Sequence, residues 1–138
     1  MENFKIIGSE EWCSFENFGI PAIKARVDSG AKTSSIQANN IKPFYKDTEE
    51  WVSFEVNPLQ ENRSITIKCE AKIYAKRTVK SSMGISEERI VVKTLTTMGS
   101  DSFEIELTLA NRDSMEFRML IGREALQNRF LVNPSVTN

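Results

Sequence analysis

Alternation of apolar and polar residues with a period of two constrains the fold of this chain more than any other feature. The clearest run, from Ile65 to Ala75, has an apolar residue at every second position and Lys68, Glu70 and Lys72 between them. Successive side chains of a β-strand point to opposite faces of a sheet, so this spacing predicts a strand with one buried face. Similar strand signals recur at residues 23–27, 51–56, 89–97 and 103–109.

Turn-forming residues separate these runs, and many short strands joined by turns predict a closed or sandwiched all-β domain. The turn signals are Asn17-Phe18-Gly19, Asn39-Asn40, Asn57-Pro58, Met83-Gly84 and Met98-Gly99-Ser100-Asp101. One segment differs, because residues 123–128 are mostly good helix formers and follow the apolar strand 119–121 through Gly122. We therefore expect one short helix near the C-terminus, and a length of 138 residues suits a single domain spanning 1–138.

The chain contains no histidine, which excludes several kinds of catalytic site. Ser-His-Asp and Cys-His nucleophile pairs are impossible, and the usual catalytic zinc sites lose their main ligand. Cys13 and Cys69 lie too far apart in sequence to form a metal-ligand motif, and we interpret them as reduced thiols. Acid–base chemistry must then come from carboxylates, Lys, Tyr or Cys, and we expect neither a metal nor another cofactor.

Charge is distributed unevenly although the formal net charge is only −1. Residues 63–100 hold eight basic residues and three acidic ones, which favours an anionic partner. Few aromatic residues accompany these charges, so we expect no nucleic-acid surface. No apolar run is long enough to span a membrane, and the N-terminal residues do not resemble a signal peptide. These features predict a cytoplasmic protein without a membrane partner.

The sharpest chemical feature is Asp28-Ser29-Gly30, directly after the strand that ends at Val27. Ser29 can brace a loop by bonding to nearby backbone, and Gly30 allows another group to approach closely. A catalytic carboxylate needs this kind of setting, with backbone donors nearby and room for a water. The tripeptide alone is also an ordinary turn sequence, and on its own it favours the plain turn.

A second feature, the apolar strand 119–121 followed by Gly122 and Arg123, strengthens the catalytic interpretation. Together the two motifs resemble retropepsin-like aspartic proteases. More closely, the chain resembles the bacterial retropepsin-like family associated with the RimK glutamate ligase, long labelled "ATP-dependent zinc protease". The resemblance implies a closed retropepsin-like (acid protease) β-barrel with one short C-terminal helix. The matching stretches are Ile7-Gly8, Glu11-Trp12, Gly19 to Ala25, Val27 to Ser34, Val79 to Ser82, Glu88-Arg89, Glu106 to Leu109, Met119 to Leu126 and Phe130 to Val132.

The resemblance implies an aspartic endopeptidase with Asp28, Ser29 and Gly30 as its catalytic loop. In such enzymes two carboxylates share one proton, and the pair activates a water. This chain has a single Asp-Ser-Gly-Ala, so we expect a homodimer with one Asp28 from each copy at the axis. In the family the late strand passes close behind the catalytic loop, and Gly122 would allow that contact.

Residues 76–89 correspond to the flap that closes over substrate in retropepsins, although a solvated hairpin is an equal alternative. Retroviral members have an acidic residue in place of Lys32, paired with the arginine that follows the late glycine. Here Lys32 and Arg123 repel each other, so Arg123 needs another carboxylate or a backbone carbonyl. The bases favour an acidic substrate. The association with a glutamate ligase, which comes from the resemblance, implies that this substrate is an oligo-glutamate protein tail. The expected substrate-binding residues are Ala31, Lys32, Thr33, Arg77, Lys80, Ser81 and Arg89.

Two positions depart from the family pattern: Gln37, where the family usually has His, and Asn111, where it often has Asp. Two other functions compete with the peptidase. One is a non-catalytic retropepsin-like module that binds acidic peptides, for which Asp28→Asn would leave function largely intact. The other is a metal-dependent hydrolase, which chelators would inhibit; the absence of His argues against it.

Overall fold

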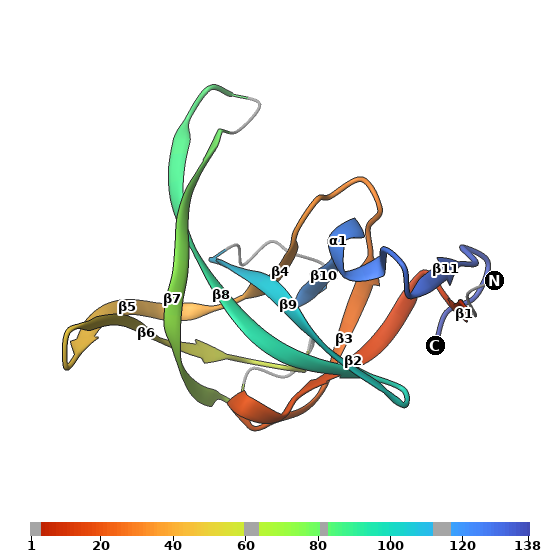
Figure 1. The fold of residues 1–138 in the computed structure, drawn as a ribbon, viewed down its shortest axis with the longest axis horizontal. Coiled ribbons are helices and arrows are strands. Elements are labelled where there is room, and N and C mark those ends of the chain that lie inside the picture. The colour runs from red at the N-terminus through yellow and green to blue at the C-terminus, as the bar shows by residue number, and fades with distance from the viewer. Residues whose placement is uncertain (1–3, 60–63, 81–82, 112–116) are drawn as a thin grey trace.

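The structure is a computed structural model that describes residues 4–59, 64–80, 83–111 and 117–138, with the backbone alone at 79 and 80. Strands make up most of the chain (Figure 1). In chain order the elements are β1 (Lys5–Ile7), β2 (Glu10–Phe15), the 3₁₀ turn η1 (Glu16–Phe18), β3 (Ile20–Val27), β4 (Ser34–Gln37), β5 (Asn39–Lys46), β6 (Glu49–Val56), β7 (Ile67–Lys80), β8 (Ser86–Met98), β9 (Asp101–Ala110), β10 (Met119–Ile121), α1 (Arg123–Leu126) and β11 (Phe130–Val132).

Six strands close into a barrel in the order β2-β3-β10-β4-β9-β8. Closure depends on β8 returning to β2, where Ser14 pairs with Thr97. The predicted closed all-β barrel is therefore confirmed. Strand β7 belongs to two parts of the fold: its first half pairs with β6, and its second half pairs with β8 in a long hairpin that leaves the barrel (Figure 1).

The barrel is filled by the inward faces of its strands, as the alternation predicts. Phe15, Ile23, Ile36, Leu107 and Met119 come from five different strands, and each is fully buried. Burial of one such side chain contributes about 1.5–3 kcal/mol, so this shared interior stabilises the closed form.

The predicted strand at 65–75 is largely correct. Cys69 and Ala71 are buried on the expected face. Ile65 lies before the strand and is 46% exposed, and the pairing of β7 with β8 has a register shift between Ile73 and Ala75. A bulge of this kind re-aims the strand, here at the point where β7 exchanges β6 for β8.

Two boundaries differ from the sequence predictions. The C-terminal helix ends at Leu126 instead of continuing to 128, and Asn128 has a left-handed backbone with φ of 63° that cannot continue a helix. Asn39-Asn40 does not form a turn between strands but opens β5. Asn40 has φ of 50° beside a register shift, so the pair forms an irregularity within the strand, since Asn tolerates the left-handed region better than most residues.

The two ends of the described chain lie together. Strand β1 pairs in parallel with β11, and both strands lie on the same side of the barrel in Figure 1. No helix within the described ranges is long and apolar enough to cross a membrane.

Candidate active site

The loop containing Asp28 is positioned by β10, which lies between β3 and β4. Strand β10 runs parallel to β3, with Ile121 beside Val27, and antiparallel to β4. The connection from β3 to β4 must therefore pass around the end of β10. The backbone N–H of Asp28 continues the ladder and donates to the Ile121 carbonyl at 2.9 Å. Asp28 therefore follows directly after the regular pairing of β3 with β10.

Gly122 allows this loop to lie against the end of β10. A Cβ atom at residue 122 would lie 2.6 Å from the Thr33 carbonyl carbon, 2.8 Å from its oxygen and 2.9 Å from the Ser34 nitrogen. All three are backbone atoms, so they cannot move aside as a flexible side chain would. The Gly122 N–H also donates to the buried Ser34 Oγ at 3.0 Å. Glycine is therefore the residue that this crossing requires.

The first turn of α1 fixes the other side of the loop. Its opening N–H groups have no partner inside the helix. The Arg123 N–H donates to the Ala31 carbonyl at 2.8 Å, and the Glu124 N–H donates to the Lys32 carbonyl at 3.1 Å. The Arg123 side chain donates through Nη1 to the Gly30 carbonyl at 3.3 Å. A backbone carbonyl thus accepts from Arg123, one of the two partners anticipated from the sequence.

The Asp28 side chain is held by its own loop. The Gly30 N–H donates to Asp28 Oδ1 at 3.0 Å, and the Ala31 N–H donates to the Asp28 carbonyl at 3.2 Å. The carboxylate is half-buried, and Oδ2 has no protein partner among the described residues. Ser29 and Gly30 are exposed beside it. This geometry presents one oriented carboxylate with an oxygen open to a proton, a water or a second carboxylate.

The predicted substrate-binding residues beside this loop have different surroundings. Ala31 is half-buried and helps to fix the loop through its backbone. Thr33 faces α1, where its Oγ1 donates to Glu124 Oε1 at 3.4 Å. Lys32 is exposed and makes no ion pair with any described residue. Of the three, only Lys32 offers an uncommitted charge to a ligand.

The predicted basic hairpin is partly neutralised within the fold. Arg77 on β7 and Arg89 on β8 lie directly opposite each other, which would repel without counterions. Arg77 Nη2 bonds Glu106 Oε1 at 2.7 Å, and Arg89 Nη2 lies 3.6 Å from Glu87 Oε2. The predicted Ser81 and the side chain of Lys80 lie outside the described residues. The hairpin and the β3–β4 loop rise on the same side of the barrel in Figure 1.

Arg89 is less fully satisfied than Arg77. Its side chain is only 11% exposed, and its Nε is buried with no hydrogen-bond partner in the described part of the chain. An unsatisfied buried donor costs about 1–3 kcal/mol, more when it is charged.

The two departures from the family pattern are in contact with each other. Gln37, at the end of β4, donates through Nε2 to Asn111 Oδ1 at 3.4 Å, although the two residues are 74 positions apart. Gln37 also bonds Asn39, whose amide donates to Asn57 at 3.1 Å. Gln37 is 2% exposed and lies at the opposite end of β4 from the Asp28 loop. The sequence singled out both positions but gave no sign that they meet.

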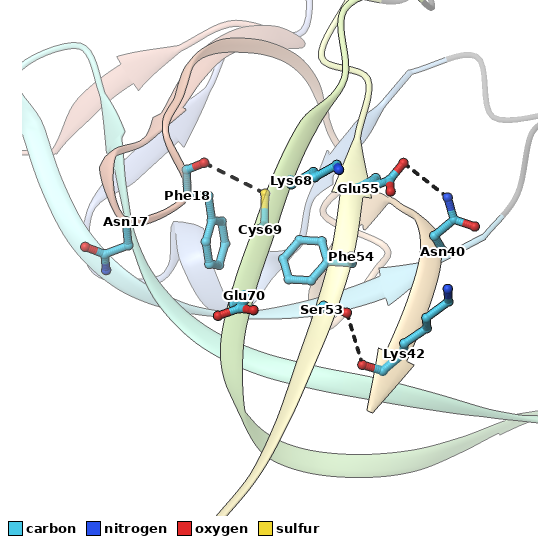
Figure 2. A pocket seen from close by; sticks show the side chains of 10 residues that line it. All are labelled: Asn17, Phe18, Asn40, Lys42, Ser53, Phe54, Glu55, Lys68, Cys69 and Glu70. Atoms are coloured by element: carbon cyan, nitrogen blue, oxygen red, sulfur yellow. Dashed lines mark hydrogen bonds between the residues drawn. The ribbon is translucent and has the colours of Figure 1, made fainter. Parts of the chain in front are cut away.

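A cavity of about 530 Å³ lies away from the Asp28 loop, among η1, β5, β6 and β7 (Figure 2). Cys69 forms part of its wall and donates through Sγ to the Phe18 carbonyl at 3.8 Å. Burial raises the pKa of Cys69 to about 12, and burial together with the Glu11 charge raises the pKa of Cys13 to about 12. Both are free, buried thiols that stay protonated at neutral pH and are poor nucleophiles. The described residues contain no cluster of three or more His, Cys, Asp or Glu that could hold a metal ion.

The barrel and its Asp-Ser-Gly loop define the chain as a retropepsin-like domain. Residues 6–138 match the family described as RimB-like, retropepsin-like aspartic endopeptidase RimB, and the chain belongs to this family. The family resemblance inferred from the sequence is thereby confirmed.

Curated relatives extend well beyond this domain. The chain is 57% identical over 134 residues to a probable alpha-L-glutamate ligase of Shewanella pealeana, and 57% identical over 132 residues to one of Desulfotalea psychrophila. These matches cover 97% and 96% of this chain but only 29% and 28% of the relatives. The crystal structure of a Legionella pneumophila protein of unknown function is similar in fold, with a TM-score of 0.80 and 24% identity over 98% of this chain and 97% of that one.

Proposed function

We propose that this chain is an aspartic endopeptidase in which Asp28 of two copies forms the catalytic pair. Two carboxylates at close range cannot both ionise, so they hold one proton between them. The ionised partner takes a proton from a water, which attacks the scissile carbonyl, while the protonated partner polarises that carbonyl. The observation that carries the proposal is the oriented Asp28 carboxylate, whose Oδ1 accepts from the Gly30 N–H and whose Oδ2 has no partner among the described residues.

The loop geometry supports this role because it limits the movement of the carboxylate. Backbone bonds to Ile121 and from the first turn of α1 fix the loop on both sides. A positioned acid or base avoids reorganisation during the reaction, and this positioning accounts for much of its catalytic effect. Each chain contributes one such loop, so a two-fold dimer supplies the second carboxylate.

We propose further that the substrate is acidic, specifically a protein tail of consecutive glutamates. Lys32 in the β3–β4 loop forms no ion pair with any described residue, and Arg89 on the hairpin has a buried Nε with no hydrogen-bond partner among the described residues. Arg77 supports this specificity less, because it lies 2.7 Å from Glu106, whereas the contact of Arg89 with Glu87 is longer, at 3.6 Å. Relatives named probable alpha-L-glutamate ligase support a functional association of this chain with glutamate addition.

A cleavage assay with matched peptides tests the proposal. The substrate is a peptide ending in an oligo-glutamate tail, and its control carries an oligo-glutamine tail of equal length. Wild type should cleave the glutamate peptide in the presence of a chelator, and Asp28→Asn should not. Asn keeps an oxygen that can accept from the Gly30 N–H, so the variant tests the charge and not the loop.

The other outcomes separate the competing functions. Activity that a chelator abolishes would identify a metal-dependent hydrolase. Equal binding of the glutamate peptide by wild type and Asp28→Asn, with no cleavage by either, would identify a non-catalytic binding module. Cleavage of the glutamine peptide alone would refute the acidic substrate and leave the peptidase intact.

A further inference from the structure

The cavity away from the Asp28 loop has the size and the lining of a small-molecule site. Its volume of about 530 Å³ lies within the range of about 300–1,000 Å³ that is typical of pockets for small ligands. Phe18, Phe54 and Cys69 form an apolar part of its wall, and all three are buried. Charged, amide and hydroxyl side chains from η1, β5, β6 and β7 form the rest (Figure 2). This lining suits a small ligand that carries charge.

Two lysines of the cavity wall carry charge that the fold leaves uncompensated. Lys42 lies on β5 and Lys68 on β7, the two strands that flank β6. Both are exposed, and neither forms an ion pair with any described residue. Neighbouring strands lie about 4.8 Å apart, so β5 and β7 are about 10 Å apart across β6. Two ammonium groups on the two sides of one cavity suit a ligand with two separated carboxylates.

The two carboxylates of the cavity wall differ in their partners. Glu55 is paired in register with Lys68, yet its Oε1 accepts from Asn40 Nδ2 at 3.1 Å. Glu70 is exposed, and its side chain forms no hydrogen bond or ion pair with any described residue. Glu70 and Lys42 lie in one row across the sheet, because both strands pair there with Ser53 of β6. The cavity therefore presents two uncommitted positive charges and one uncommitted negative charge.

We propose that this cavity is a ligand-binding site for a small acidic zwitterion, such as an acidic α-amino acid or its dipeptide. Carboxylates of the ligand would meet Lys42 and Lys68, and its ammonium group would meet Glu70. Hydrogen bonds between charged groups are roughly twice as strong as those between neutral groups, so three such contacts would fix the orientation of the ligand. Methylene groups of the ligand would lie against the apolar wall at Phe18 and Phe54.

The chemical class of this ligand follows from the charges of the cavity alone. Its source rests on the proposed function, because cleavage within a glutamate tail releases short glutamate peptides. The cavity would then bind a product of the reaction at a distance from the Asp28 loop, and it would take no part in the cleavage step.

Titration of isotope-labelled protein with L-glutamyl-L-glutamate, followed by NMR, tests the inference. Wild type should show saturable shifts of the backbone signals of β5, β6 and β7 around the cavity. The double variant Lys42→Gln, Lys68→Gln should bind about tenfold more weakly, because each ion pair near a surface changes affinity by up to about fivefold. The control Lys72→Gln alters another exposed lysine of β7, which pairs with Glu49 and does not line the cavity, and it should bind like wild type.

A comparison of L-glutamate with glutarate tests the contact of the ligand ammonium group. Glutarate has both carboxylates but no amino group. Glu70→Gln keeps the size of the side chain and removes its charge, so it should weaken the binding of L-glutamate by up to about fivefold. The same variant should bind glutarate at least as tightly as wild type does. Equal weakening of both ligands would overturn the assigned ammonium contact.

The remaining results separate this site from the proposed catalytic site. The inference fails if wild type shows no saturable shifts, or if the double lysine variant binds as tightly as wild type. It also fails if the shifts fall on residues 28–33 and Lys32→Gln abolishes them, because the dipeptide would then occupy the proposed substrate site. Binding in the cavity by a wild type that cleaves no glutamate-tailed peptide would refute the peptidase and support this site. Cleavage without binding in the cavity would support the peptidase and refute this inference.

Discussion

Replacing Gly122 by alanine tests how the Asp28 loop is supported. The added methyl group would lie 2.6–2.9 Å from three backbone atoms of Thr33 and Ser34, well inside ordinary contact distance. Relief requires displacement of the loop or of β10, because none of these atoms belongs to a flexible side chain. Overpacking of a tight site lowers the free energy of unfolding by about 1–3 kcal/mol. Because the clashes here are with backbone atoms, we expect Gly122→Ala to lower it by about 3 kcal/mol. For a chain of this length that loss lowers Tm by roughly 10 °C.

Gly84→Ala is the matched control. A Cβ atom at residue 84 meets nothing within 4 Å, but the backbone there has φ of +80°. The cost is then only the left-handed conformation, about 1–2 kcal/mol. Thermal and urea unfolding followed by circular dichroism give both free energies. We expect Gly122→Ala to lose more stability than Gly84→Ala and to lose peptide cleavage as the loop shifts. Equal losses for the two variants would refute the close crossing of the loop over β10.

Three further predictions follow from other parts of the structure. Arg89→Gln should raise KM for the glutamate-tailed peptide about tenfold with little change in kcat, and an unchanged KM would remove this residue from substrate binding. Gln37→His and Asn111→Asp should be coupled by about 1 kcal/mol in a double-mutant cycle of unfolding free energies, whereas additive effects would show that their contact contributes nothing. Cys13 and Cys69 should not react with an alkylating reagent in the native protein at pH 8. Folding raises the pKa of both thiols from 9.0 to about 12, so above pH 9 the native state binds more protons than the unfolded state. The unfolding free energy should therefore fall as the pH rises from 9 towards 12. A constant unfolding free energy over that range would contradict the burial of the thiols.

Local patterns in the sequence predicted the strands well, and also the loop that follows Val27. The strand 119–121 has its predicted bounds, and the helix begins directly after Gly122. The alternation correctly predicted the buried positions Cys69 and Ala71. These features depend on neighbouring residues alone, which explains why a period of two and a helix-forming segment were sufficient to predict them.

Features that depend on distant residues could not be predicted in this way. Barrel closure rests on the contact of Ser14 with Thr97, and neither residue has a local signal for it. The basic stretch indicated free charge on the hairpin, but Glu106 on another strand neutralises Arg77. Asn39-Asn40 has the composition of a turn, yet β6 pairs with this segment and incorporates it into β5. In each case a tertiary contact decided the outcome.

Mixing wild type with Asp28→Asn tests the shared catalytic pair most directly. The two proteins are combined in equal amounts, allowed to exchange subunits and assayed on the glutamate-tailed peptide. If each active unit needs Asp28 from two copies, random pairing gives about a quarter of the dimers two wild-type subunits, and only these are active. The mixture should then have about a quarter of the activity of wild type at the same total concentration. Activity of about one half would show that each chain acts alone, and would contradict the two-copy site.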